Sequence, residues 1–229
     1  MKNSRILVLS LLICFGLSLS LAAADNGLCL ECHSDPVLTA ERQRRENSIF
    51  VDQKRFQSSV HHALECVDCH MDADVDEFPH PENLDKISCG MCHDEAEEAF
   101  MDGIHGRALN RNAPYAPTCR ECHGEHYILP RTDVKSRTYK MNIPVLCGKC
   151  HREGAPVARV YNISERNILS NYSQSIHGEG LFKQGLIVTA TCNDCHGNHR
   201  ILPHTYTRSS VSLRNIAGTC MTCHARIEE

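Results

Sequence analysis

The chain has 229 residues, a formal net charge of −4 and no tryptophan, and only 5% of its residues are aromatic. This length normally corresponds to one domain or two small ones, but the apolar side chains would make a thin core. The sequence also holds 15 cysteines and 15 histidines. Cysteine at this density indicates a disulfide scaffold, a metal protein or a covalent cofactor.

The first 24 residues have the three parts of a secretory signal. Lys2 and Arg5 precede a 16-residue apolar run, which is followed by Ala22-Ala23-Ala24. The run is shorter than the roughly 20 residues that span a bilayer. We expect cleavage after Ala24 and export to the periplasm or the cell exterior, with no membrane span afterwards. A retained anchor is the alternative.

Cleavage would also remove Cys14 and two basic residues, which leaves 22 basic and 28 acidic residues and a net charge of −6. An acidic protein does not attract the phosphates of nucleic acid, so nucleic acid is excluded as a partner.

Three stretches predict short helices. Ala40–Asn47 is charged and predicts a solvated helix face, and Asp94–Met101 and Ser164–Ser175 are rich in Glu, Arg, Asn and Leu. Ile-Leu-Pro tripeptides at 128–130 and 201–203 mark turns of the chain. No alternating strand pattern persists. We expect a mostly irregular fold of short α-helices and loops.

Seven C-x-x-C pairs are each followed directly by histidine. They are Cys29-Cys32-His33, Cys66-Cys69-His70, Cys89-Cys92-His93, Cys119-Cys122-His123, Cys147-Cys150-His151, Cys192-Cys195-His196 and Cys220-Cys223-His224. C-x-x-C-H is the attachment sequence of haem c. The two thiols add to the vinyl groups on one porphyrin edge, and the histidine binds the iron from one face. We therefore predict seven covalent haems.

A zinc ribbon and a disulfide scaffold both fit the motif less well than haem does. A zinc ribbon needs paired cysteines but no histidine after every pair. Disulfides do not require a two-residue gap each time. Haem attachment also takes place outside the cytoplasm, which agrees with the predicted export signal.

The chain contains an internal repeat. Residues 104–151 match residues 176–224, with a constant offset of 73 residues from Cys119 onward, and a weaker copy covers residues 58–93. We therefore predict a signal (1–24), a leading single-haem segment (25–57), and three two-haem units. The first unit is 58–103, the second 104–175 and the third 176–229.

Eight histidines lie outside the motifs, and six of them recur at matched positions. These are a leading histidine in each unit (His61, His105, His177) and a middle histidine (His80, His126, His199). We predict all six as second iron ligands. His126 and His199 follow a motif histidine by three residues, a reach of about 10 Å at most. They cannot pass around the porphyrin, so each should bind the iron of a neighbouring haem.

Seven irons leave one further ligand position, for which His62 and His204 compete. His204 has no counterpart in the earlier unit, where Arg131 stands. His62 follows His61 directly, and adjacent side chains diverge, so the two could bind different irons. We prefer His62. Methionine is an alternative ligand through Met71, Met91, Met101, Met141 or Met221, although none recurs.

The sequence resembles the periplasmic multihaem cytochromes c in which H-G precedes C-x-x-C-H-G-x-H and a second C-x-x-C-H follows. The resemblance covers residues 58–224 and implies bis-histidine irons in a fold organised around stacked covalent haems. The first unit departs from the pattern, because His62 replaces the glycine after the leading histidine and Met71 replaces the glycine after the first motif.

Relatives of this kind include electron shuttles, subunits of quinol-oxidising membrane complexes, filament-forming cytochromes and haem-based reductases. We expect an electron carrier between respiratory redox proteins, such as a quinol-oxidising complex or other cytochromes. Association into oligomers or filaments is compatible with that role. A multihaem reductase is the alternative, and it would need one iron with an open coordination position.

Overall fold

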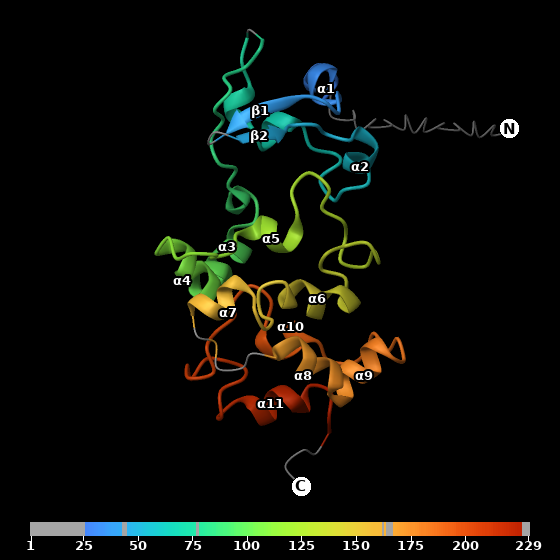
Figure 1. The fold of residues 1–229 in the computed structure, drawn as a ribbon, viewed down its shortest axis with the longest axis vertical. Coiled ribbons are helices and arrows are strands. Elements are labelled where there is room, and N and C mark those ends of the chain that lie inside the picture. The colour runs from blue at the N-terminus through green and yellow to red at the C-terminus, as the bar shows by residue number, and fades with distance from the viewer. Residues whose placement is uncertain (1–25, 43–44, 77, 162, 164–166, 226–229) are drawn as a thin grey trace, which may run out of the picture.

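The computed structural model is elongated, and the chain runs from one end of its long axis to the other (Figure 1). It describes residues 26–42, 45–76, 78–161, 163 and 167–225. The predicted signal, residues 1–24, lies outside the described residues. Among the described residues, no helix is both long and apolar enough to cross a membrane.

Regular structure consists of short helices and one small sheet, so the expected mostly irregular fold with short α-helices is confirmed at this level. The elements are α1 (Gly27–His33), β1 (Thr39–Arg42), β2 (Arg45–Ser48), α2 (Gln53–Gln57), η1 (Cys66–Asp68), η2 (Met71–Ala73), η3 (Cys89–Met91), α3 (Asp94–Asp102), α4 (Ile104–Asn110), α5 (Cys119–His123), η4 (Lys140–Asn142), α6 (Ile143–Gly148), α7 (Pro156–Val160), α8 (Ile168–Gln174), α9 (Ile176–Phe182), α10 (Cys192–His196) and α11 (Ile216–Met221).

The helix predicted over Ala40–Asn47 is wrong. Strands β1 and β2 pair there as an antiparallel hairpin, with Thr39 opposite Ser48 and Ala40 opposite Asn47. The Ile49 amide donates to the Leu38 carbonyl (3.2 Å) and so extends the pairing beyond the strands. An isolated helix of eight residues is marginal in water, whereas the hairpin satisfies the same backbone groups and brings the flanking apolar residues together.

The other two predicted helices are present. Helix α3 covers Asp94–Met101 and extends to Asp102, and three acidic residues in its first turn complement the helix dipole. Helix α8 begins at Ile168, and residues 164–166 of that prediction lie outside the described residues.

The glycine that follows the leading histidine is required by a tight corner between two helices. Helix α4 follows α3 after Gly103, and α9 follows α8 after Ser175. A Cβ atom on Gly106 would collide with the Phe100 carbonyl oxygen, and one on Gly178 with the Tyr172 carbonyl oxygen. In the first unit no helix begins at the leading His61 after the short α2, and His62 stands in place of the glycine.

Matched hydrogen bonds reproduce the repeat in the second and third units. The buried Ser136 hydroxyl donates to the Leu129 carbonyl, and the buried Ser209 hydroxyl donates to the Leu202 carbonyl, both over 3.1 Å. The motif helices α5 and α10 each begin with a capping box and end at a glycine with positive φ, 95° at Gly124 and 83° at Gly197.

Each junction between units uses the same backbone contact. The Val60 amide donates to the Ile128 carbonyl, and the Ile104 amide donates to the Ile201 carbonyl, both over 2.8 Å. The residue before a leading histidine is thus fixed to the Ile-Leu-Pro segment of the next unit. Buried apolar side chains are few among the described residues: Pro144, Ala155, Leu181 and Leu202.

Asp102 at the end of α3 belongs to the first unit, and it joins this unit to the second and the third. Its carboxylate pairs with Arg107 (2.8 Å), Arg200 (3.0 Å) and Arg208 (3.1 Å). Hydrogen bonds from Arg208 and then Arg107 lower the pKa of Asp102 below its ordinary value of 3.8. A carboxyl with a lowered folded-state pKa contributes stability above its ordinary pKa, and that stability is lost as the pH falls through the folded-state pKa.

Asp102→Asn is therefore expected to lower the melting temperature at pH 7 by a few degrees, with the difference disappearing at a pH well below 3.8. Calorimetry of the mature protein at both pH values measures it. Glu125→Gln is the matched control, because the Arg120–Glu125 pair (3.3 Å) is more exposed and confined to one unit. An equal decrease at both pH values would show that the charge network does not stabilise the junction.

Candidate functional site

Twelve of the histidines form six pairs, each of one motif histidine and one histidine outside the motifs. The ring centres are 5.9 Å apart in His33–His80 and His177–His224, and 6.0 Å apart in His61–His93, His70–His126, His105–His151 and His123–His199. Two imidazoles that bind one metal ion from opposite sides, through bonds of about 2.0 Å, have ring centres about 6 Å apart. All six pairs therefore have room for one iron between the rings.

The pairing follows a rule across the units. Each leading histidine lies beside the second motif of its own unit, as His105 lies beside His151. Each middle histidine lies beside the first motif of the preceding unit, so that His126 faces His70 and His199 faces His123. The structure thus places His126 and His199 away from the motif that each follows in the sequence. His80 in the same way faces His33 of the leading segment.

Three histidines stand outside these pairs. All 15 histidines lie in the described part of the chain, and within it His62, His196 and His204 have no partner ring at the 6 Å spacing. His62 and His204 are exposed. The structure brings neither of these two candidates for the seventh position beside a motif histidine.

Burial favours the neutral form of six of the twelve paired imidazoles, and a metal-binding imidazole must be neutral. Burial lowers the pKa of His105 to about 4, and it lowers the pKa of His61, His70, His123, His126 and His151 as well. The Nδ1 atom of His33 bonds to the Ile49 carbonyl, and that of His80 to the Pro81 carbonyl, both over 2.9 Å. Because a carbonyl only accepts, Nδ1 donates and Nε2 keeps its lone pair for a metal.

The 14 motif cysteines are all free thiols, so the described part of the chain contains no disulfide. Thiols of successive motifs lie close enough to interact, in the order of the chain. The neighbours are Cys29–Cys66, Cys69–Cys92, Cys89–Cys119, Cys122–Cys150, Cys147–Cys192 and Cys195–Cys220. Burial, reinforced by Cys29, raises the pKa of Cys66 to about 11, so this thiol stays protonated.

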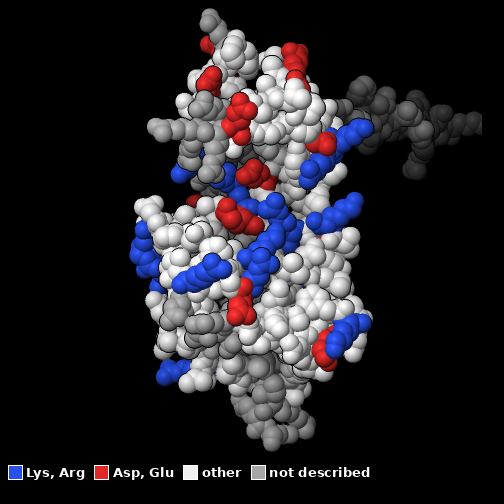
Figure 2. Space-filling model, in the orientation of Figure 1, with Lys and Arg blue, Asp and Glu red and all other residues white. Residues whose placement is uncertain are grey.

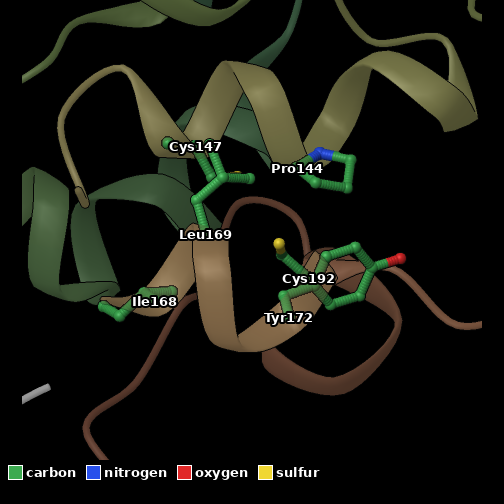
Figure 3. A pocket seen from close by; sticks show the side chains of 7 residues that line it. Pro144, Cys147, Ile168, Leu169, Tyr172 and Cys192 are labelled. Atoms are coloured by element: carbon green, nitrogen blue, oxygen red, sulfur yellow. The ribbon is translucent and has the colours of Figure 1, made fainter. Parts of the chain in front are cut away.

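Figure 3 shows one of these junctions, an apolar pocket between α6, α8 and α10. Cys147 and Cys192, from successive motifs, both line it, together with Leu169 and Tyr172 of α8. The Tyr172 hydroxyl donates to the Ala190 carbonyl (2.9 Å) and holds α8 against the start of α10. The pocket is therefore an apolar gap at the boundary of two motifs.

Within the described residues, no three His, Cys, Asp or Glu side chains gather as a site for a bare metal ion. No family model, no curated protein and no solved structure matches the chain. Sequence reasoning missed the complete pairing and the unpaired His196. An alignment of the three units could have indicated that the middle histidines are equivalent, but not which motif histidine each of them faces.

Proposed function

We propose that this chain is an exported heptahaem c-type cytochrome that transfers electrons between redox proteins. The observation that carries the proposal is the set of six histidine pairs at 5.9–6.0 Å, each with a motif histidine on one side. A disulfide or zinc scaffold would give the spare histidines no reason to stand opposite motif histidines at a constant distance. A bis-histidine iron requires that arrangement.

The chain's own residues would have three tasks at each of the six sites that have a histidine pair. The two motif cysteines would hold the porphyrin edge, the motif histidine would bind the iron on one side, and the paired histidine would bind it on the other. Backbone carbonyls, such as that of Ile49 at His33, fix the orientation of the ring. Haem, when bound, supplies at each site an iron that can gain or lose one electron. Two imidazoles on one iron would leave it no open position, which favours electron transfer over substrate binding.

The order in which thiols of successive motifs lie near one another supports a continuous path for electrons. Successive motifs are neighbours from α1 to α11, and these helices lie at opposite ends of the long axis (Figure 1). Porphyrins attached at adjacent thiols would be close together. The path would therefore connect a donor at one end to an acceptor at the other. We propose redox proteins of an exported respiratory chain, such as a quinol-oxidising membrane complex or another cytochrome, as these partners.

His196 favours a second candidate function. Its motif is the one without a paired histidine among the described residues. An iron held there by His196 alone would have one open position, which a haem-based reductase needs.

The proposed carrier is expected to take up seven electrons per chain, over a broad range of mostly negative potentials, because bis-imidazole ligation keeps potentials lower than histidine–methionine ligation. Coulometric titration of the mature protein measures this uptake, and intact mass after denaturation counts the attached haems. Fewer than seven haems would contradict the haem assignment. Seven haems with rapid reduction of nitrite, hydroxylamine, sulfite or tetrathionate would instead support the reductase.

A further inference from the structure

The pairing rule defines what the site at His196 lacks. The first motifs of the first and second units each face the middle histidine of the following unit, whereas the first motif of the third unit, at His196, faces no histidine among the described residues. The partner of His196 would accordingly belong to a fourth unit. Residues 1–229 contain three units, and two of their histidines, His62 and His204, stand outside the pairs.

Two further contacts between the second and third units have no counterpart, in the described part of the chain, at the matched positions of the third unit. We therefore regard the surface around these positions as a junction without a partner. Between the second and third units, Ile104 donates its amide to the Ile201 carbonyl and Lys140 pairs with Asp194 over 2.6 Å. The matched positions in the third unit are Ile176 and Leu213. Ile176 is 80% exposed where Ile104 is 42% exposed, and its amide has no acceptor among the described residues. Leu213 is 95% exposed.

His62 has the properties of a ligand prepared for an external metal. Its Nδ1 atom bonds to the Ser59 carbonyl over 3.0 Å, the same arrangement that orients the paired His33 and His80. This leaves Nε2 with a free lone pair, on an exposed side chain next to His61. His204 is also exposed, but no carbonyl of the described chain holds its ring.

The charges of the two halves are complementary. Residues 25–103, which contain His62, carry 19 acidic and 6 basic side chains, a net charge of −13. Residues 104–229, which contain His196, carry 9 acidic and 16 basic side chains, a net charge of +7. Acidic side chains lie over the N-terminal end, and basic side chains over the middle and lower part of the face in Figure 2. Copies placed head to tail would therefore attract one another.

We propose that this chain assembles head to tail, and that His62 of a second copy binds the iron of the haem attached at Cys192, Cys195 and His196. This inference rests on the proposed function, since it needs a haem at that motif. The acidic N-terminal half of one copy covers the exposed surface around Ile176 and Leu213 of the next. Because each copy has one donor and one acceptor at different places, the contact repeats and produces chains of copies. The iron site is completed only in the assembly.

The experiment compares the mature heptahaem protein with His62→Ala and with the matched variant His204→Ala. At high concentration and low salt, the unmodified protein should form assemblies with all seven haems low-spin. Dilution into high salt should give monomers in which one haem of seven is high-spin, since salt screens the charge attraction. His62→Ala should be monomeric with one high-spin haem under both conditions, and His204→Ala should behave as the unmodified protein. Light scattering gives the size, and electron paramagnetic resonance and resonance Raman spectra give the spin states.

Four results would overturn the inference. Assemblies that persist in His62→Ala would show that another contact holds them. Seven low-spin haems in the dilute monomer would place a ligand from the same chain on the iron, and loss of this state in His204→Ala would identify it. A high-spin haem that remains in the assemblies would mean an open iron, as in a reductase. Fewer than seven haems by intact mass would instead refute the proposed function itself.

Discussion

His199→Ala is expected to make the haem at Cys119, Cys122 and His123 high-spin, while the other ligated haems remain low-spin. The ring centres of His199 and His123 are 6.0 Å apart, and no other histidine of the described chain lies opposite His123 at this distance. Loss of one imidazole leaves the iron with an open or water-bound position. About one seventh of the haem should therefore change its spin state, and the variant should bind cyanide at that iron. Resonance Raman spectra and a cyanide titration measure the change.

His204→Ala is the control in the same loop, because His204 faces no motif histidine and its loss should leave the spectra unchanged. His126→Ala is the matched variant, which should open the iron at His70 instead. The crystal structure of the cyanide-bound variant identifies the open iron. An unaltered spectrum, or no cyanide at the haem attached to Cys119 and Cys122, would show that the His123–His199 pair does not bind an iron.

The chain produced without haem is expected to remain unfolded. The buried apolar side chains among the described residues are Pro144, Ala155, Leu181 and Leu202, which are too few for a chain of this length. The free energy from binding seven haems would then be folding free energy, as in small metal-dependent domains. Residues 25–229 made in a compartment without haem attachment, with thiols kept reduced, should show no cooperative transition in urea by circular dichroism.

The heptahaem protein is the control, and it should unfold in a single steep transition or a few. Protease treatment provides a second measurement, because the haem-free chain should be cleaved throughout its length. A cooperative transition in the haem-free chain would mean that the short helices and their junctions are stable without the cofactor.

Local chemistry determined much of this protein from the sequence alone. The C-x-x-C-H motifs, the offset of 73 residues and the recurring histidines are all contained within short stretches of chain. Helix α3 could be predicted for the same reason, since its acidic first turn favours a helix by itself. The exclusion of His126 from the iron at His123 also needed only the three residues between them, because chain length limits reach.

Tertiary structure decided what depends on residues far apart. The hairpin β1–β2 replaced the predicted helix because pairing with the flanking chain satisfies more backbone groups than a short isolated helix. The partner of each motif histidine depends on how one unit packs on the next, as in the contact between His70 and His126. That packing also leaves His196 without a partner ring. A repeat pattern states which residues are equivalent, but only the packed units show which of the equivalent contacts are made.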